Sequence, residues 1–294
     1  MPATPRRYVT GEEDSSRWDG FAFREGDIVI STRSKSGTTW MQMICALLVF
    51  GSPILPDRLG RLSPWFDHLV APREEVAARL ADQQHRRVIK THTPLDGVPL
   101  DPRAQYIVVA RHPLDMAVSL YHQGANIDRT WLRALIGQPE PATPAAPRPR
   151  LHDWLLGWID SDESPFEAMD SLPGVMWHLS DAWQRGQGPN ILLVHYDDLL
   201  ADLDGQMNRI ANWLAIPVDP LAWPSLVNAA RFDQMRSRAN DLVPEAGILK
   251  DQAAFFRGGK SGAGREILDD RELAHYYSRA TELAPPSLLS WLHR

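Results

Sequence analysis

Short apolar runs alternate along the chain with longer segments of helical periodicity. The runs are rich in β-branched residues and bounded by polar ones, which is typical of buried strands. We expect four strands within the segments 26–30, 86–94, 104–113 and 190–200. Apolar residues at helical spacing predict helices over 40–51, 73–84, 114–126, 151–160, 173–185, 201–214 and 220–230, with one more near the C-terminal end. This alternation favours an α/β fold with a central parallel sheet flanked by helices.

The domain organisation is simple. The chain shows no internal repeat and no convincing linker, so we interpret residues 1–294 as a single domain. Residues 1–20 are expected to form a leader that packs on its surface. The proline-dense segment GQPEPATPAAPRPR (137–150) cannot form regular structure, and it predicts an exposed loop that is either disordered or a lid near a site.

The bulk composition excludes several classes of protein. A net charge of −6 and a pI of about 5.9 give no global attraction for nucleic acid. The single cysteine, Cys45, excludes an intrachain disulfide and argues against a cysteine zinc site. No apolar run approaches the roughly 18 residues of a membrane helix, and the N-terminus lacks the apolar stretch of a signal peptide. We therefore expect a soluble, cytoplasmic protein.

Lysine is rare in this chain, which has four lysines against 27 arginines. A compact ammonium reaches a crowded phosphate where the wide guanidinium does not fit. Two of the lysines, Lys35 and Lys90, directly follow or end predicted strands. Their positions suggest a role that arginine cannot fill.

Cations follow three of the four predicted strands. Lys35 comes after the first strand, Lys90 after the second and Arg111 after the third, whereas His195 and Tyr196 follow the fourth. In an open parallel sheet, ligands bind beyond the carboxyl ends of the strands. Positive charge converging there in an acidic chain predicts a polyanionic ligand.

The loop STRSKSGTTW (31–40) leads from the first strand into the first helix. Unpaired N–H groups at a helix N-terminus attract anions, so this turn is a candidate phosphate site. It does not match the Walker A pattern, because Lys35 precedes Gly37 and no glycine begins the loop. The GKS string within 258–262 follows no predicted strand, and we interpret it as a coincidental match.

Five motifs occur in the order and spacing of a known family. They are SKSGTTW (34–40), KTHTP (90–94), VVARHPLDMAVSLYH (108–122), HYDDL (195–199) and FFRGGKSG (255–262). From about residue 20 to 265 the chain resembles the cytosolic-type sulfotransferases, whose donor is 3′-phosphoadenosine 5′-phosphosulfate (PAPS) and whose product is adenosine 3′,5′-bisphosphate (PAP). The resemblance implies a P-loop nucleotide-kinase-like fold and sulfuryl transfer, without a metal, to a hydroxyl or amine of a small-molecule or glycolipid acceptor.

The resemblance also implies a donor site in three parts. The 5′-phosphosulfate binds the Lys35 ammonium and the backbone N–H groups of Ser36, Gly37, Thr38 and Thr39. Adenine lies against Trp40, Tyr196 and Phe232. The 3′-phosphate is held by Arg111, Ser119, Arg257, Gly258 and Gly259.

In the same resemblance His92 is the base that takes the proton of the acceptor hydroxyl. An imidazole pKa near neutrality suits that task. Lys90 supports the sulfuryl oxygens, and Lys35 neutralises charge on the bridging oxygen as the S–O bond breaks. We interpret His112, His122 and His195 as packing or hydrogen-bonding residues.

The chain departs from the family pattern at several positions. Gly258 stands where the family has lysine, and Lys260 is a candidate to compensate for it. Ala230 and Arg231 stand where hydroxyl side chains are usual. The family's dimerisation signature is absent from GREILDDREL (264–273), so a homodimer is not supported by the sequence.

Two rival functions follow from the same residues. One is a metal-dependent P-loop kinase with Asp197 or Asp198 on magnesium, and the other is a nucleotide-binding protein without catalysis, in which His92 would have no purpose. The sequence does not identify the acceptor. Candidates for the walls of its pocket are Trp65, Phe66, Trp131 and Trp154.

Overall fold

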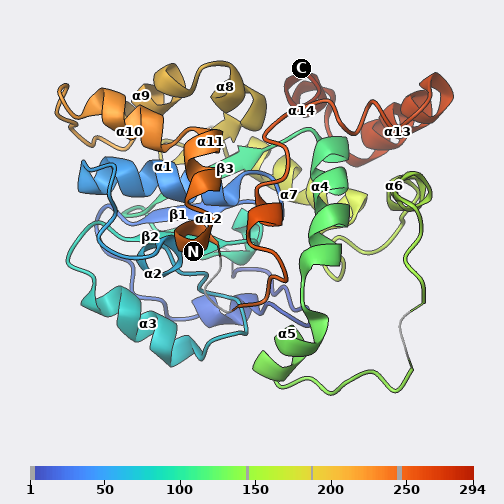
Figure 1. Ribbon diagram of the computed structural model, residues 1–294, viewed down its shortest axis with the longest axis horizontal. Coiled ribbons are helices and arrows are strands. Elements are labelled where there is room, and N and C mark those ends of the chain that lie inside the picture. Colours follow the sequence, from blue (N-terminus) through green and yellow to red (C-terminus); the bar gives the residue numbers. More distant parts are fainter. Residues whose placement is uncertain (1–3, 144–145, 187, 244–246) are drawn as a thin grey trace.

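The computed structural model describes residues 4–143, 146–186, 188–243 and 247–294. Within them the strands form one four-stranded parallel sheet of order β2-β1-β3-β4 (Figure 1). The strands are β1 (Ile28–Ser31), β2 (Val88–Thr91), β3 (Gln105–Ala110) and β4 (Ile191–His195). Each lies inside or within one residue of a predicted segment, so the prediction of an α/β fold with a parallel sheet is confirmed.

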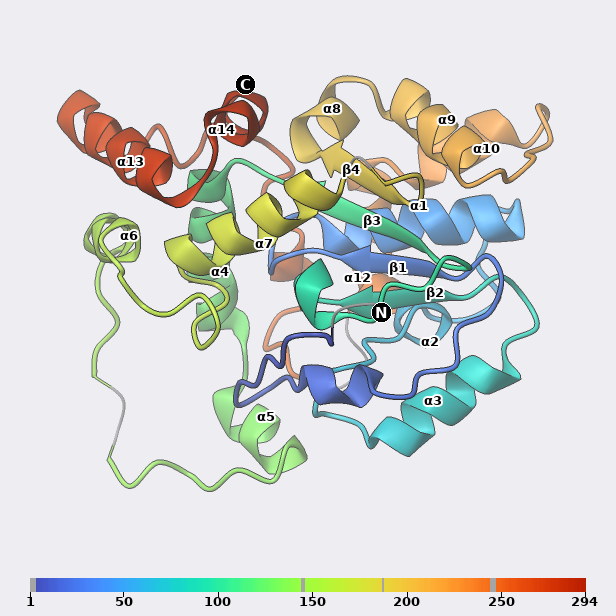
Figure 2. The same ribbon diagram turned by 180° about the vertical axis from the view of Figure 1, so that it is seen from behind.

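Helices cover both faces of the sheet because each strand buries side chains on both sides (Figures 1 and 2). Ile28 and Ile30 of β1 belong to one hydrophobic cluster, and Val29 belongs to the other. The first face packs against α1 (Thr38–Phe50), α9 (Leu203–Trp213) and α10 (Trp223–Ala229). The second packs against α3 (Arg73–Asp82), α4 (Pro113–Asn126), α6 (Leu151–Ile159), α7 (Leu172–Arg185), α13 (Asp270–Leu283) and α14 (Pro286–Leu292).

Several short helices were not predicted. Each has seven or fewer residues, which is too few for a helical period to stand out in the sequence. They are α2 (Leu59–Leu62), α5 (Arg129–Leu135), α8 (Tyr196–Ala201), α11 (Phe232–Ser237) and α12 (Ala239–Leu242), with the 3-10 turns Ser15–Trp18, Leu95–Gly97 and Ala253–Phe255. The predicted strand segment 190–200 therefore ends earlier, at His195, where α8 begins.

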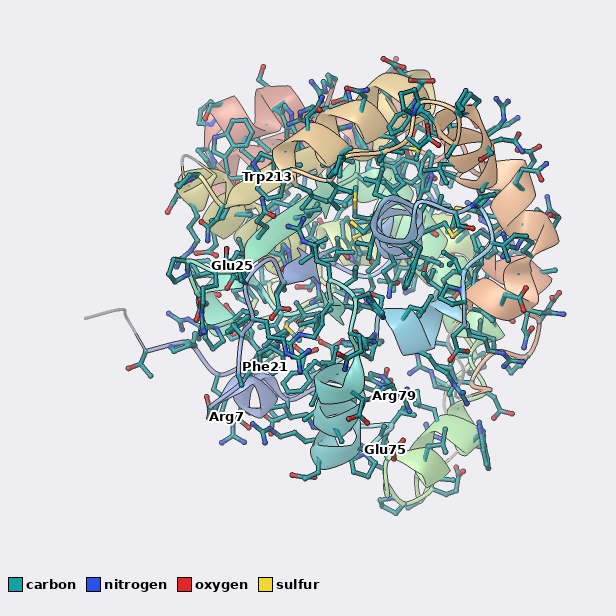
Figure 3. All side chains as sticks on the ribbon, turned by 90° about the vertical axis from the view of Figure 1, so that its left-hand side faces the viewer. Arg7, Phe21, Glu25, Glu75, Arg79 and Trp213 are labelled. Carbon is teal, nitrogen blue, oxygen red and sulfur yellow. The ribbon has the colours of Figure 1, made fainter. Side chains whose placement is uncertain are left out.

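The N-terminal segment is part of the core. Tyr8 and Trp18 are 1% and 0% exposed, and the Trp18 indole donates to Asp67 Oδ2 at 3.0 Å. Figure 3 shows Phe21 beside α3, whose Arg73 donates to the carbonyl of Arg17 at 2.8 Å. The Trp18 and Phe21 rings belong to the hydrophobic cluster beneath β1 and β3, whereas most of residues 4–14 are exposed or half-buried. The segment expected as a surface leader over residues 1–20 is therefore packed into the core at its Trp18 end.

The proline-dense segment 137–150 connects α5 to α6 as a long extended loop (Figure 1). Its described residues are exposed, as the sequence predicts, and residues 144–145 lie outside the described part. Its role as a lid stays a prediction. Among the described helices, none combines the length and the apolar character needed to cross a bilayer.

Candidate active site

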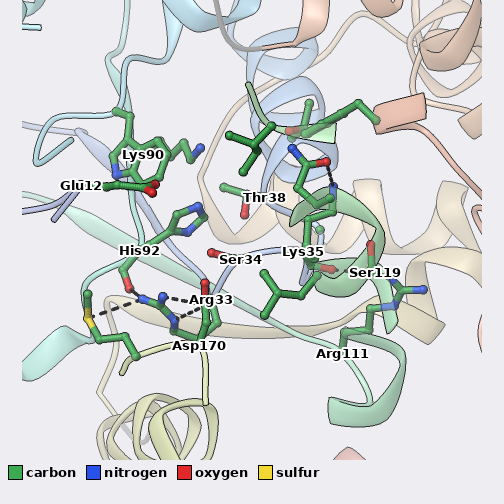
Figure 4. Close-up of a pocket in the computed structure, with 18 of the residues that line it drawn as sticks. Glu12, Arg33, Ser34, Lys35, Thr38, Lys90, His92, Arg111, Ser119 and Asp170 are labelled. Carbon is green, nitrogen blue, oxygen red and sulfur yellow. Dashed lines mark hydrogen bonds and ion pairs between the residues drawn. The ribbon is translucent and has the colours of Figure 1, made fainter. Parts of the chain in front are cut away.

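The carboxyl ends of the strands open into one cavity of about 490 Å³. Fourteen of the fifteen predicted site residues line it, and Ser36 is the exception. The fourteen are Lys35, Gly37, Thr38, Thr39, Trp40, Lys90, His92, Arg111, Ser119, Tyr196, Phe232, Arg257, Gly258 and Gly259. Figure 4 shows His92 between Lys90 and Glu12 on one side and Lys35, Ser119 and Arg111 on the other.

Ser36 lies buried behind the loop, where its N–H donates to the carbonyl of Arg33 at 3.2 Å. The structure therefore brings the predicted residues together from loops that are far apart in the sequence. Their chemical roles are a separate question.

The loop between β1 and α1 has an unusual backbone. Lys35 adopts a left-handed conformation with φ 64°, which is uncommon for a residue other than glycine. Gly37 has φ 110°, and a Cβ there would come within 3.0 Å of the Tyr196 ring. These two residues turn the chain sharply into α1, whose first N–H groups have no partner within the helix. A non-glycine residue held in this region costs about 1–3 kcal/mol and is often found at functional sites.

The Lys35 ammonium lies inside the cavity without a carboxylate partner among the described residues. Its Nζ sits 3.9 Å from the centre of the Phe255 ring and 3.4 Å from Gln123 Oε1. Burial, followed by the positive charges of Arg111, Lys90 and Arg257, lowers the pKa of Lys35 to about 7. An anion in the cavity would restore the charged form, so this lysine is suited to bind one.

Arg111 joins the loops around the cavity. Its Nη2 donates to the carbonyl of Lys260 at 2.8 Å, and its guanidinium lies 4.4 Å from the centre of the Tyr196 ring. Its Nε is buried and has no hydrogen-bond partner among the described residues. A buried donor of this kind is costly to leave unpaired, and together with the lining cations Arg257 and Lys260 it fits a bound polyanion.

The segment after η3 (Ala253–Phe255) is anchored to α4. The Asp115 carboxylate accepts hydrogen bonds from the N–H groups of Gly262 and Gly264, both at 2.8 Å. This contact places Arg257, Gly258, Gly259 and Lys260 along the cavity. The lining position of Lys260 is consistent with its expected compensation for Gly258.

Aromatic side chains line the cavity near α1. The Trp40 indole donates to the carbonyl of Ala230 at 2.8 Å and meets the Tyr196 ring edge-to-face at 5.2 Å. Ala230 lacks the hydroxyl usual in the family, but its backbone fixes the Trp40 ring. Phe232 lies on Gly259, where a Cβ would approach its ring to 2.6 Å. Together these residues can bind a planar ring.

His92 is held in one tautomer. Its Nδ1 forms a short hydrogen bond with the carbonyl of Thr32, so Nδ1 carries the proton and the lone pair of the neutral ring is on Nε2. Burial, followed by the charges of Lys90 and Arg33, lowers the pKa of His92 well below its usual 6.5. The imidazole is therefore neutral at pH 7, with its Nε2 lone pair free. The pKa near neutrality that the sequence analysis expected is not found in the free protein.

Lys90 lies on the same side of the cavity as His92. Its Nζ is 3.8 Å from the centre of the Trp65 ring, and the edge of that ring meets His92 at 4.4 Å. Burial lowers the pKa of Lys90 to about 8, although the carboxylates of Glu13 and Asp67 oppose this shift. Lys90 thus remains largely charged at pH 7.

The sequence analysis missed Arg33, which supports His92. Its guanidinium pairs with Asp170 at 2.7 Å and also donates to the carbonyl of His92. Its side chain is 3% exposed. Arg33 lies two residues before Lys35 in the same loop, and this position could have identified it. Its partner Asp170 could not be identified in this way, because it lies 137 residues away in the sequence.

The pocket walls differ from the expectation for an acceptor site. Trp65 lines the cavity, whereas Phe66 is fully buried in the core and Trp131 and Trp154 do not line it. Of the four aromatic residues that were expected to form walls of the acceptor pocket, Trp65 alone lines the cavity. In place of the others, the N-terminal segment 10–13 lines the cavity, and no feature of the sequence indicated that.

The acidic residues of the kinase alternative have other partners. Asp197 Oδ1 accepts a short hydrogen bond from the Ser261 hydroxyl, and Asp198 pairs with Arg294. Both lie in the first turn of α8, where negative charge is favourable. Across the described ranges, no group of three or more His, Cys, Asp and Glu side chains is arranged to hold a metal ion.

The sulfotransferase domain family matches residues 25–282. This chain belongs to the sulfotransferase family. It is 40% identical, over 95% of its length and 91% of the relative's, to the glycolipid sulfotransferase of Mycobacterium bovis. It is 30% identical to human sulfotransferase 2B1 over 81% of this chain and 60% of that protein. The resemblance inferred from the five motifs is confirmed, and the chain is a PAPS-dependent sulfotransferase.

Solved structures share the fold of this sulfotransferase. Retinol dehydratase, in a complex with androsterone and the inactive cofactor PAP, superposes with a TM-score of 0.67 at 20% identity, covering 93% of this chain and 86% of that chain. Mouse sulfotransferase SULT7A1, complexed with PAP, gives a TM-score of 0.63 at 20% identity, covering 91% and 88%. The P-loop-like fold expected from the sequence is therefore confirmed.

Gly259 and Gly258 provide a matched test of the cavity wall. Gly259→Ala is expected to lower the free energy of unfolding by about 1–3 kcal/mol, because a Cβ at φ +60° meets the Phe232 ring. Gly258→Ala meets nothing within 4 Å, and its effect is expected within about 0.5 kcal/mol. Urea denaturation measures both values. Equal effects of the two substitutions would contradict the contact between Gly259 and Phe232.

Proposed function

We propose that this sulfotransferase moves a sulfuryl group from PAPS to a hydroxyl of a glycolipid acceptor, with His92 as the base. The observation that carries the proposal is the neutral His92 ring, whose Nε2 lone pair lies in the same cavity as the Lys35 ammonium, which has no carboxylate partner among the described residues. Support for the acceptor class comes from the 40% identical relative, which is named a glycolipid sulfotransferase.

The donor is proposed to bind on the Lys35 side of the cavity. Lys35 and the N–H groups at the start of α1 would hold the 5′-phosphosulfate. The adenine would lie among the rings of Trp40, Tyr196 and Phe232. The 3′-phosphate would pair with the Arg111 Nε and with Ser119, Arg257 and the backbone of Gly258 and Gly259, while Lys260 replaces the missing family lysine.

When bound, PAPS supplies the sulfuryl group that is transferred. His92 Nε2 takes the proton of the acceptor hydroxyl as its oxygen forms a bond to sulfur. Lys35 neutralises the charge that develops on the bridging oxygen when the S–O bond breaks, and Lys90 stabilises the equatorial oxygens. Arg33 holds the backbone of His92 and thereby fixes the position of the base.

The first test is calorimetric titration of the protein with PAP, 5′-AMP and ATP, each with and without EDTA. We expect PAP to bind most tightly, because it alone carries a 3′-phosphate for the unpaired Arg111 Nε, and we expect EDTA to have no effect. Preference for ATP, or binding that requires magnesium, would favour the kinase and contradict the sulfotransferase proposal.

His92→Ala is expected to reduce sulfuryl transfer by about 10²–10⁴-fold, which is the usual contribution of a general base. PAP affinity should change little, because His92 lies on the other side of the cavity from Arg111 (Figure 4). The loss of the buried hydrogen bond to the Thr32 carbonyl should lower the free energy of unfolding by about 1–3 kcal/mol and leave the protein folded. His122→Ala is the matched control, since His122 does not line the cavity. Retained turnover in His92→Ala would remove this residue from the mechanism.

The affinity for PAP is expected to fall as the pH rises from 7 to 9. Lys35, with a pKa of about 7 in the free protein, is charged when the anion is bound, so binding takes up a proton above pH 7. The fall is at most tenfold for each pH unit. Calorimetry at three pH values measures it, and Lys35→Met should abolish it whereas Lys90→Met should not. A constant affinity would show that Lys35 does not contact the anion.

A further inference from the structure

Glu13 is a buried carboxyl group that the mechanism above does not use. The residue lines the cavity and is 7% exposed. Its Oε2 is buried and accepts no hydrogen bond within the described part of the chain. A buried polar atom without a partner is costly, and in the wall of a cavity a ligand can supply that partner.

Contacts place Glu13 on the side of the base. It forms an antiparallel bridge with His68, whose ring stacks on Trp65 at 4.0 Å. Trp65 in turn contacts His92 and Lys90, at 4.4 and 3.8 Å from its ring. Glu13 therefore belongs to the part of the cavity where the acceptor would meet His92, away from Arg111 and the nucleotide.

Three other acidic residues line the cavity: Glu167 is exposed, and the other two already have partners. Glu12 pairs with Arg129 at 2.9 Å, and Asp170 pairs with Arg33 at 2.7 Å. Burial, together with the neighbouring Asp67 and Asp170, raises the pKa of Glu13 to about 8 against the opposing charges of Arg33 and Lys90. At pH 7 Glu13 is mostly protonated and offers one O–H donor and one carbonyl acceptor.

We propose that Glu13 binds a second hydroxyl of the acceptor, other than the one that receives the sulfuryl group. A hydroxyl both donates and accepts, and so it matches the protonated carboxyl. An acceptor with a single hydroxyl on an apolar body leaves Glu13 unpaired. The site therefore selects polyhydroxylated acceptors such as a sugar ring, and this inference rests on the function proposed above.

The test compares two acceptors with the same alkyl chain, octyl β-glucoside and octan-1-ol, which has one hydroxyl. Glu13→Met keeps the length of the side chain but removes its polar atoms, and we expect it to lower kcat/KM for the glucoside at least ~10-fold. The value for octan-1-ol should stay the same or rise. Glu13→Gln retains a donor and an acceptor, and should stay within about threefold of wild type on both acceptors. Glu75→Met, on the exposed face of α3, is the control.

If Glu13→Met does not fold, the inference is tested with the wild-type enzyme and monodeoxy analogues of octyl glucoside, each of which lacks one hydroxyl. For the wild-type enzyme, removal of one particular hydroxyl should reduce kcat/KM about as much as Glu13→Met does. Where the variant folds, it should be insensitive to that same removal. If every deoxy analogue reacts like the parent glucoside, the inference is overturned.

The outcomes separate this inference from the proposed function. Equal losses for glucoside and octanol in Glu13→Met and in Glu13→Gln would overturn the inference and leave the sulfuryl transfer intact. A wild-type enzyme that transfers to octanol but not to the glucoside would overturn both the inference and the glycolipid acceptor. Absence of PAP binding would overturn the proposed function itself.

Discussion

Three cations in the cavity rest on aromatic rings instead of carboxylates. Lys35 lies over Phe255, Lys90 over Trp65 and Arg111 over Tyr196. An aromatic face attracts a cation without cancelling its charge. The positive charge at the strand ends therefore stays available for an anionic ligand, and the surrounding loops are arranged to keep these rings in place.

This arrangement explains the backbone and ionisation of the site together. Burial lowers the pKa of Lys35 toward neutrality, and the neighbouring cations, which have no counter-charge close by, lower it further. The left-handed backbone at Lys35 and the buried, unpaired Nε of Arg111 also cost stability in the free protein. An anion in the cavity would offset two of these costs, because it would favour the charged form of Lys35 and pair with the Arg111 Nε.

The sequence was sufficient to predict the fold and most of the residues that line the cavity. Four apolar runs identified the strands, and parallel strands bring their carboxyl ends to one edge, which is why Lys35, Lys90 and Arg111 could be grouped before the structure was considered. Each of these residues is adjacent to a strand, so local patterns determine its place.

The acceptor side could not be predicted in the same way. Glu13 is held at the cavity by its backbone bridge with His68, and the Arg33 side chain is held by Asp170. In both pairs the two residues are far apart in the sequence, so no local sequence pattern indicates the contact. The tryptophan residues did not predict the walls of the acceptor pocket reliably. The hydrophobicity of a tryptophan is the same in a cavity wall, as at Trp65, and on the half-exposed surface, as at Trp131.

The segment that carries Glu13 has a consequence for how such enzymes diversify. Residues 10–13, Trp65 and His68 line one side of the cavity, while the loop after β1 and residues 255–260 line another. In the function proposed above, different stretches of the gene would therefore encode recognition of the two substrates. Mutations near the N-terminus would then change what is sulfated while the residues that hold the donor are inherited intact.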